Sequence, residues 1–82
     1  MPREQSDASY LEDMLTAARA VVFFTRDRSF DDYAGDLLLR SAVERQIEII
    51  GEAARRVSAV LKKQHPEIPW DKITRAATRF GA

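Results

Sequence analysis

Three regularly spaced carboxylates are the first candidates for chemistry in this sequence. Glu44, Glu48 and Glu52 recur every four residues, so on a helix they would line one side. Stacked carboxylates can bind metal ions in helical bundles, but those sites also need Glu-x-x-His pairs and acidic residues on facing helices, which the sequence lacks. Arginines three or four positions away can neutralise the glutamates: Arg40, Arg45, Arg55 and Arg56. We expect a solvated face of ion pairs, and neither a metal nor a cofactor.

His65 is the only histidine and the next candidate. It follows two lysines and a glutamine and precedes Pro66, so we expect it in an exposed corner at a helix end, where the helix dipole favours a cation. A general base needs a nucleophile nearby, and a metal ligand needs a second ligand. The sequence places neither beside His65, so we assign it no catalytic role.

A basic cluster near the end of the chain could bind phosphates. Residues 1–54 hold six Lys or Arg and eleven Asp or Glu, whereas residues 55–82 hold seven and two. On a last helix Lys72, Arg75 and Arg79 would share one face, beside the rings of Trp70 and Phe80, as RNA binding favours. The two rings can equally anchor that helix in the core, and the basic end can complement an acidic face of the fold or of a second subunit. We favour these structural interpretations.

Length and composition limit the other possibilities. Eighty-two residues allow one small domain, and 45% hydrophobic with 32% charged residues is ordinary for a folded protein. With no cysteine, disulfides, thiol catalysis and cysteine-based zinc sites are excluded. The three glycines lie far apart, so there is no phosphate-binding loop. No apolar run fits a membrane span or a signal peptide, and we expect a cytoplasmic protein without membrane contact.

Helical periodicity dominates the first half of the sequence. Ser9 and Glu12 fit a capping box at the start of a helix over about residues 7–26. Its apolar stripe runs at intervals of three and four: Leu11, Met14, Leu15, Ala18 and Val22. Ser29 can cap a short connecting turn that ends at Gly35.

A much longer helix is predicted over residues 36–64, capped by Asp36. At 1.5 Å per residue its 28 or so residues would span about 42 Å. Its core or dimer face, with Trp70 from the last helix, consists of Leu39, Val43, Ile47, Ile50, Gly51, Ala54 and Val57. Leu38, Ala42, Ile49, Ala53 and Val60 widen that stripe beyond what one short helix can cover. We therefore expect a homodimer, and at Gly51 a close helix crossing or a mild kink.

The last helix follows an ordered corner at residues 65–69 and begins near Pro69. Trp70, Ile73, Ala77 and Phe80 fall on one of its faces. The sequence shows no strand-like alternation. The predicted fold is all-α: a single domain forming an antiparallel bundle of three main helices plus a short connecting helix.

Two stretches of this sequence resemble the HepT-like toxins, small helical ribonucleases of the HEPN class. They are residues 42–53, with Gly-Glu-Ala at 51–53, and residues 65–73, with Pro-Glu-Ile-Pro-Trp at 66–70. The resemblance covers roughly residues 7–73. It implies a dimeric, HEPN-like helical bundle, paired in prokaryotic toxin–antitoxin operons with an MntA-like nucleotidyltransferase.

The resemblance also implies an activity. Such toxins cut RNA without a metal, through an Arg-x4-His motif on the last helix, and two copies face each other across the dimer in a positively charged cleft. A histidine can move the proton of the ribose 2′-hydroxyl while an arginine stabilises the phosphoryl charge. The antitoxin is thought to adenylylate a tyrosine two residues beyond the histidine.

This chain departs from that pattern after about residue 73, where the catalytic tail is missing or altered. Register carried forward from Trp70 and Ile73 places the motif's arginine at Ala77 and its histidine at Ala82. We therefore predict no catalytic residue. The expected function is a catalytically deficient HepT-like subunit that dimerises and binds its antitoxin, or RNA through Lys72, Arg75 and Arg79. The alternative is a non-enzymatic helical module for dimerisation or protein interaction.

Overall fold

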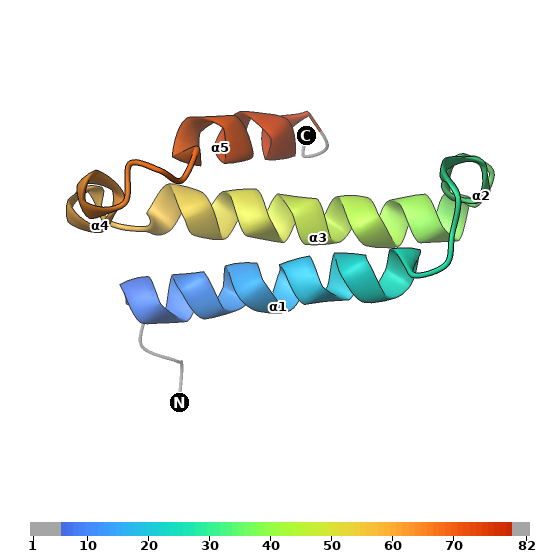
Figure 1. Ribbon diagram of the computed structural model, residues 1–82, viewed down its shortest axis with the longest axis horizontal. Helices are drawn as coiled ribbons and strands as arrows, with labels where there is room; N and C mark the ends of the chain where they lie inside the picture. Colours follow the sequence, from blue (N-terminus) through green and yellow to red (C-terminus); the bar gives the residue numbers. More distant parts are fainter. Residues whose placement is uncertain (1–5, 80–82) are drawn as a thin grey trace.

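The computed structural model describes residues 6–79, and this part of the chain is helical without strands. The elements are α1 (Asp7–Thr25), α2 (Phe30–Ala34), α3 (Leu37–Arg56), α4 (Ala59–Gln64) and α5 (Trp70–Thr78). Figure 1 shows α3 between α1 and α5, with both neighbours antiparallel to it and with α2 and α4 at its two ends. The predicted all-α, HEPN-like bundle of three main helices is confirmed, with two short helices where one was expected. No described helix is long and apolar enough to cross a bilayer.

The start of α1 is capped differently from the prediction. Ser6 is the N-cap, and its hydroxyl accepts a hydrogen bond from the backbone N–H of Ser9 at 3.2 Å. The Ser9 hydroxyl in turn accepts from the Ser6 N–H at 2.9 Å, which completes the capping box. Placing the cap at Ser9 with Glu12 was therefore wrong, because a serine can serve at the third helical position in place of glutamate.

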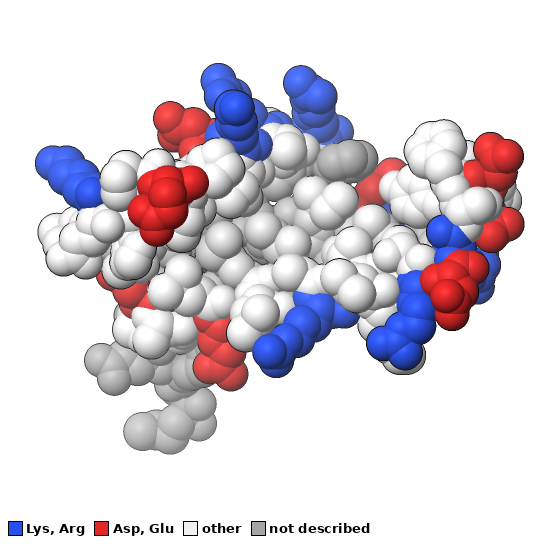
Figure 2. Space-filling view, in the orientation of Figure 1, with Lys and Arg blue, Asp and Glu red and all other residues white. Residues whose placement is uncertain are grey.

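Most of the predicted apolar stripe of α1 is exposed, and of its large side chains only Met14 packs against the core cluster. Ala17 is buried, whereas Leu11, Leu15 and Val22 are 37%, 49% and 65% exposed. The buried and half-buried side of α1 carries Met14 together with small, polar and aromatic side chains: Ser9, Tyr10, Asp13, Ala17 and Phe24. In Figure 2 the surface over α1, along the lower edge, shows uncharged atoms between red and blue side chains. This helix is apolar on two sides, so periodicity alone does not tell which side enters the core.

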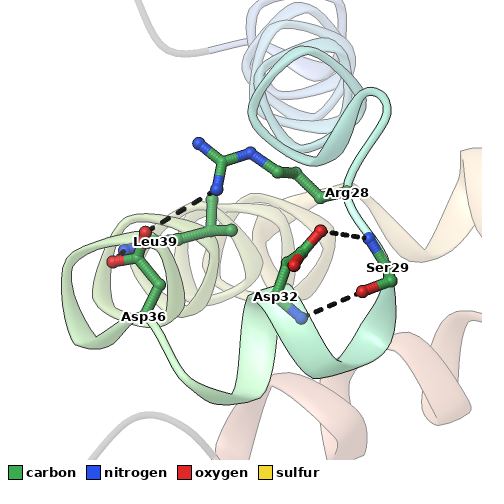
Figure 3. A network of polar contacts seen from close by, with 5 residues as sticks. All are labelled: Arg28, Ser29, Asp32, Asp36 and Leu39. Atoms are coloured by element: carbon green, nitrogen blue, oxygen red, sulfur yellow. Dashed lines mark hydrogen bonds and ion pairs between the residues drawn. The ribbon is translucent and has the colours of Figure 1, made fainter.

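Polar contacts fix the turn from α1 through α2 to α3 (Figure 3). Ser29 caps α2 as predicted: its hydroxyl accepts from the Asp32 N–H at 3.0 Å, and the Asp32 carboxylate accepts from the Ser29 N–H at 3.0 Å. The predicted cap Asp36 accepts from the Leu39 N–H at 3.0 Å and pairs with Arg28 at 3.8 Å. The predicted end of the short helix at Gly35 is also confirmed.

The long helix predicted over residues 36–64 is interrupted. It ends at Arg56, Val57 is extended, and Ser58 caps the separate helix α4 by accepting from the Leu61 N–H at 3.1 Å. The backbone N–H of Ser58 donates to the carboxylate of Asp7 at 2.8 Å, and the Ser58 hydroxyl donates to it at 2.6 Å. The continuous helix was therefore a wrong prediction. A carboxylate at the start of α1 binds the backbone at the break.

The close crossing predicted at Gly51 is confirmed. Gly51 is buried, and a Cβ placed there would overlap the Cβ of Ala77 and lie 3.5 Å from the Ala77 Cα. The absent side chain lets α3 and α5 approach at this point. Phe80, predicted to extend the apolar face of α5, lies outside the described residues.

The predicted face of α3 is largely a core within one chain. Leu39, Val43, Gly51, Ala54 and Val57 are buried, as is Trp70, while Ile47 and Ile50 are half-buried. Ala54, Val57 and Trp70 form the core cluster, against which Tyr10, Met14, Leu61, Ile68 and Ile73 pack. Because α1 and α5 lie on two sides of α3, the width of its stripe needs no second chain. Of the residues that widen the stripe, only Leu38 and Val60 are largely exposed, at 82% and 68%.

Replacing Gly51 by alanine tests the crossing. At an open helical site Gly→Ala stabilises by about 1 kcal/mol, but here the new methyl overlaps Ala77. We expect Gly51→Ala to lower the free energy of unfolding by about 1–3 kcal/mol and Tm by on the order of 10 °C, measured by circular dichroism. Gly35→Ala is the control, since its Cβ would make an ordinary contact at 3.4 Å. Ala77→Gly in the Gly51→Ala background should restore part of the loss, and a neutral Gly51→Ala would refute the crossing.

The Asp7–Ser58 contact should make stability depend on pH. Hydrogen bonds from the hydroxyl of Ser58, and then from its backbone N–H, lower the pKa of Asp7. A carboxyl whose pKa is lower in the folded than in the unfolded chain stabilises the fold above its unfolded pKa, and this contribution is lost as the pH falls through the folded pKa. Wild type should therefore exceed Asp7→Asn in Tm at neutral pH, with the gap closing below about pH 4.

Thermal unfolding of both proteins across the acid range is the measurement. The other carboxyls with lowered pKa, Asp32 and Glu67, titrate in both proteins and cancel in the difference. Asp31→Asn, which removes an exposed carboxylate from the first turn of α2, is the matched control. A gap between wild type and Asp7→Asn that stays constant with pH would contradict the assignment.

Candidate nucleic-acid interface

The three cations predicted to bind RNA lie together on the outer side of α5. Lys72, Arg75 and Arg79 are exposed and line one shallow groove of about 360 Å³ with Ala76. Within residues 6–79 none of the three forms an ion pair, so their charges are available to a ligand. The structure therefore brings together the residues that the sequence grouped by helical spacing. Whether they bind RNA stays a prediction.

Trp70 holds α5 in place. Its ring is 8% exposed, inside the core cluster, and its Nε1–H donates a hydrogen bond to the backbone C=O of His65 at 3.1 Å. The Lys62 ammonium lies 5.9 Å from the centre of the ring, within range of a cation–π contact. The core interpretation of Trp70 is confirmed, and its exposed edge also contributes to the surface beside the cations.

Two lysines from α4 extend the positive surface. A second groove of about 460 Å³ runs between the end of α4 and α5, and its basic lining residues are Lys62, Lys63, Lys72 and Arg75. We call these four residues and Arg79 the basic face. Figure 2 shows blue side chains over α5 and the neighbouring end of α4, along the upper edge. Lys62 and Lys63 were not predicted to belong to this face, because an unbroken helix over residues 36–64 would have carried them away from α5.

The signal for the break was present in the sequence. Arg55 and Arg56 occupy the last turn of α3, where cations favour a helix C-terminus, and Ser58 follows as an N-cap residue. The apolar stripe continues through Val57 and Leu61, and it concealed the change of helix.

His65 occupies the exposed corner predicted for it. It ends α4, and its Nδ1 lies 3.0 Å from the carboxylate of Glu67. The backbone N–H of Glu67, and then the His65 ring, lower the pKa of that carboxyl. The backbone C=O of His65 accepts a hydrogen bond from the Trp70 ring N–H, so this corner helps to hold α5 in place.

Two of the three glutamates of α3, Glu48 and Glu52, form the ion pairs predicted along the helix. Glu48 lies 3.4 Å from Arg45 and Glu52 lies 3.7 Å from Arg56. Both pairs are exposed, where such contacts add little stability. Among the described residues no group of three acidic or histidine side chains could hold a metal ion.

Comparison with known proteins identifies the family of this helical bundle. The family model for HepT-like ribonucleases matches residues 14–79. The chain belongs to the HepT-like ribonuclease family. The match begins within α1 and extends through α5, so it includes most of the core and all of the basic face on α4 and α5.

Individual relatives match most of this chain but only part of their own length. A protein named "Probable ribonuclease HepT" from Thermococcus cleftensis is 40% identical over 72 residues, which is 88% of this chain and 66% of that protein. A protein named as a candidate RNase from Methanocaldococcus jannaschii is 34% identical over 65 residues, 79% of this chain and 60% of its own length. Another from Caldanaerobacter subterraneus is 33% identical over 64 residues, covering 78% and 57%. This chain thus spans about three fifths of these relatives, and no solved structure matches it significantly.

The HepT-like motif has no counterpart in the described structure. No arginine in the sequence is followed five positions later by histidine. Ala77, where the resemblance places the motif's arginine, is 4% exposed and packs against Gly51. The longer side chain of an arginine would not fit there without moving α5. The position of the motif's histidine, Ala82, lies outside the described residues.

Proposed function

We propose that this chain is a HepT-like toxin subunit of a prokaryotic toxin–antitoxin system that binds RNA without cleaving it. Family membership carries the proposal, since the chain belongs to a family of ribonucleases. The basic face supplies the binding, and no arginine of this sequence is followed five positions later by the histidine that would supply the cleavage.

The chemistry of the basic face supports a nucleic-acid ligand. Five cations from α4 and α5 line two adjoining grooves, and Asp71 is the one acidic residue among their lining residues. Cations arranged in this way bind phosphates largely through release of the counterions that surround the nucleic acid.

The placement of α5 supports the lack of cleavage. Catalysis by the family's motif needs arginine and histidine side chains that reach the phosphate and the 2′-hydroxyl. In this chain the position of the arginine is turned inward against Gly51. The nearby Arg75 and Arg79 can attract RNA, but no histidine follows either of them at the motif's spacing.

The partners belong to the proposal as well. We propose that the subunit forms a homodimer and that it is held by an MntA-like nucleotidyltransferase antitoxin in a cytoplasmic complex. The resemblance of residues 42–53 and 65–73 to the HepT-like toxins supports this assignment.

One observation favours the alternative, a non-enzymatic module for protein interaction. A groove of about 510 Å³ at the junction of α1 and α3 includes the apolar side chains of Phe23, Phe24, Leu38 and Leu39. Leu38 and Phe23 are 82% and 66% exposed, as in surfaces that bind other proteins. The two functions differ in a simple property, because only the RNA-binding subunit has a salt-sensitive affinity for RNA.

A binding and cleavage experiment tests the proposal. Fluorescence anisotropy with labelled single-stranded RNA, between about 50 and 200 mM salt, should show an affinity that falls with salt. Arg75→Gln/Arg79→Gln should weaken binding on the order of tenfold at low salt and reduce the slope against log salt by about 1.4, for two lost phosphate contacts.

The matched control removes two cations elsewhere. Arg45→Gln/Arg56→Gln changes the net charge equally but acts on the exposed ion pairs of α3, so RNA affinity should stay near that of the wild type. Gel analysis of the same RNA after incubation in EDTA should show it intact. Metal-independent cleavage that is lost in His65→Ala would overturn the claim that this chain does not cleave, and equal binding by both double variants would remove the role of α5.

A further inference from the structure

The break between α3 and α4 is held by a side chain from outside the two helices. No glycine or proline lies between residues 52 and 65, so the backbone there could continue as one helix. In an unbroken helix the N–H of Ser58 would donate to the C=O of Ala54, four residues earlier. In the structure it donates to the carboxylate of Asp7 at 2.8 Å, and the Ser58 hydroxyl donates to the same carboxylate at 2.6 Å. The Asp7 carboxylate thus replaces the helical acceptor that Ser58 loses at the break.

The direction that α4 takes after the break decides where two cations of the basic face lie. Leu61 of α4 packs against the core cluster that contains Trp70. The ammonium of Lys62 lies 5.9 Å from the centre of the Trp70 ring, and Lys62 and Lys63 line the groove beside α5. In an unbroken helix residue 62 would lie about 9 Å beyond Arg56 along the axis of α3, at 1.5 Å per residue. Figure 1 shows α4 turned out of the line of α3 at the end where α5 begins.

We propose that Asp7 is a positioning residue for RNA binding: its hydrogen bonds to Ser58 hold α4 beside α5 and so keep Lys62 and Lys63 on the basic face. The inference rests on the RNA binding of the proposed function and adds a control of that binding from the first helix. With Asp7 in place, five cations lie on one surface. Without it α4 can continue the line of α3, which leaves only the three cations of α5.

Charge alone predicts the opposite effect of removing Asp7. The pKa of this carboxyl is lowered by hydrogen bonds from the hydroxyl and then the N–H of Ser58, and also by the charge of Lys62. Its negative charge therefore lies close to the basic face, and loss of that charge should by itself strengthen the attraction of RNA. A positioning role predicts weaker binding instead. The sign of the change in RNA affinity thus separates the two effects.

Replacing Asp7 by alanine is the first test, and Asp36→Ala is the matched control. Each variant removes one carboxylate that accepts from the backbone at a helix start, and each changes the net charge equally. By fluorescence anisotropy with labelled single-stranded RNA at low salt, Asp7→Ala should bind about three- to tenfold more weakly than the wild type. Asp36→Ala should bind no more weakly than the wild type. Unchanged or tighter binding by Asp7→Ala would overturn the inference.

A double-mutant cycle shows whether Asp7 acts through the two lysines. Lys62→Gln/Lys63→Gln should weaken RNA binding on the order of tenfold, for two lost phosphate contacts. Adding Asp7→Ala to this double variant should cause no further loss, because the cations that Asp7 positions are already gone. A further loss as large as the one in the wild type would show that Asp7 acts through overall stability, which contradicts the positioning role.

Trp70 reports the place of α4 directly, because it is the only tryptophan in the sequence. Departure of α4 removes Leu61 and Lys62 from the surroundings of the ring, so the fluorescence of Asp7→Ala should shift to longer wavelength than that of Asp36→Ala. Helix content by circular dichroism should stay equal or rise, since the residues at the break join a continuous helix, whereas unfolding would lower it. An unshifted emission would show that α4 keeps its place without the carboxylate.

A disulfide supplies a reversible form of the same contact, because the sequence has no cysteine of its own. The side chains of Asp7 and Ser58 meet directly, so Asp7→Cys/Ser58→Cys should form a disulfide on oxidation. The oxidised protein should bind RNA like the wild type, and the reduced protein should bind it like Asp7→Ala. Equal RNA affinity of the two forms would refute the inference, as would failure of the disulfide to form.

These outcomes separate the inference from the proposed function. RNA binding that depends on Arg75 and Arg79 but not on Asp7 removes the positioning role and leaves the proposed function intact. A wild type that does not bind RNA overturns the proposed function, and the inference with it. In that case the emission of Trp70 still shows whether the Asp7 carboxylate holds α4.

Discussion

The contact between Gly51 and Ala77 is the constraint on which the positive surface depends. Backbone approaches backbone at this point because α3 has no side chain there and α5 has only a methyl group. The approach fixes the height of α5 above α3 and lets Trp70 enter the core between Ala54 and Val57. Because Trp70 and Ala77 point inward, the helical period places Lys72, Arg75 and Arg79 on the outer side of α5. A packing requirement in the core thus decides which side chains are available to a ligand.

Much of this fold could be predicted from local patterns. Several features depend only on residues adjacent in the sequence: the caps at Ser29 and Asp36, and the corner at His65 and Pro66. The helix crossing depends on a single glycine, Gly51. The break at Ser58 could not be predicted in this way, because the carboxylate that holds it comes from Asp7, 51 positions earlier. The orientation of α1 in the bundle could not be predicted from local patterns either. Both of its sides carry apolar residues, and only the tertiary contacts select Ala17 for the interior.

The residues of the candidate site could likewise be predicted only in part. The three cations of α5 follow from helical spacing, whereas Lys62 and Lys63 join them only because α4 turns away from the axis of α3. Family membership supplies the connection to RNA, and the buried position of Ala77 bears on the chemistry. Binding needs only charge on a surface, but cleavage needs one group placed at the 2′-hydroxyl and another at the phosphate.

The hydrogen bonds between Asp7 and Ser58 also bear on how the chain acquires its structure. During synthesis residue 7 is added well before residue 58, so the carboxylate of Asp7 has no Ser58 donor until the chain has grown that far. Contacts between distant residues form late, after the intervening loop has closed. The boundary between α3 and α4 should therefore be among the last features to settle, and a nascent chain could pass through a state in which both form one straight rod.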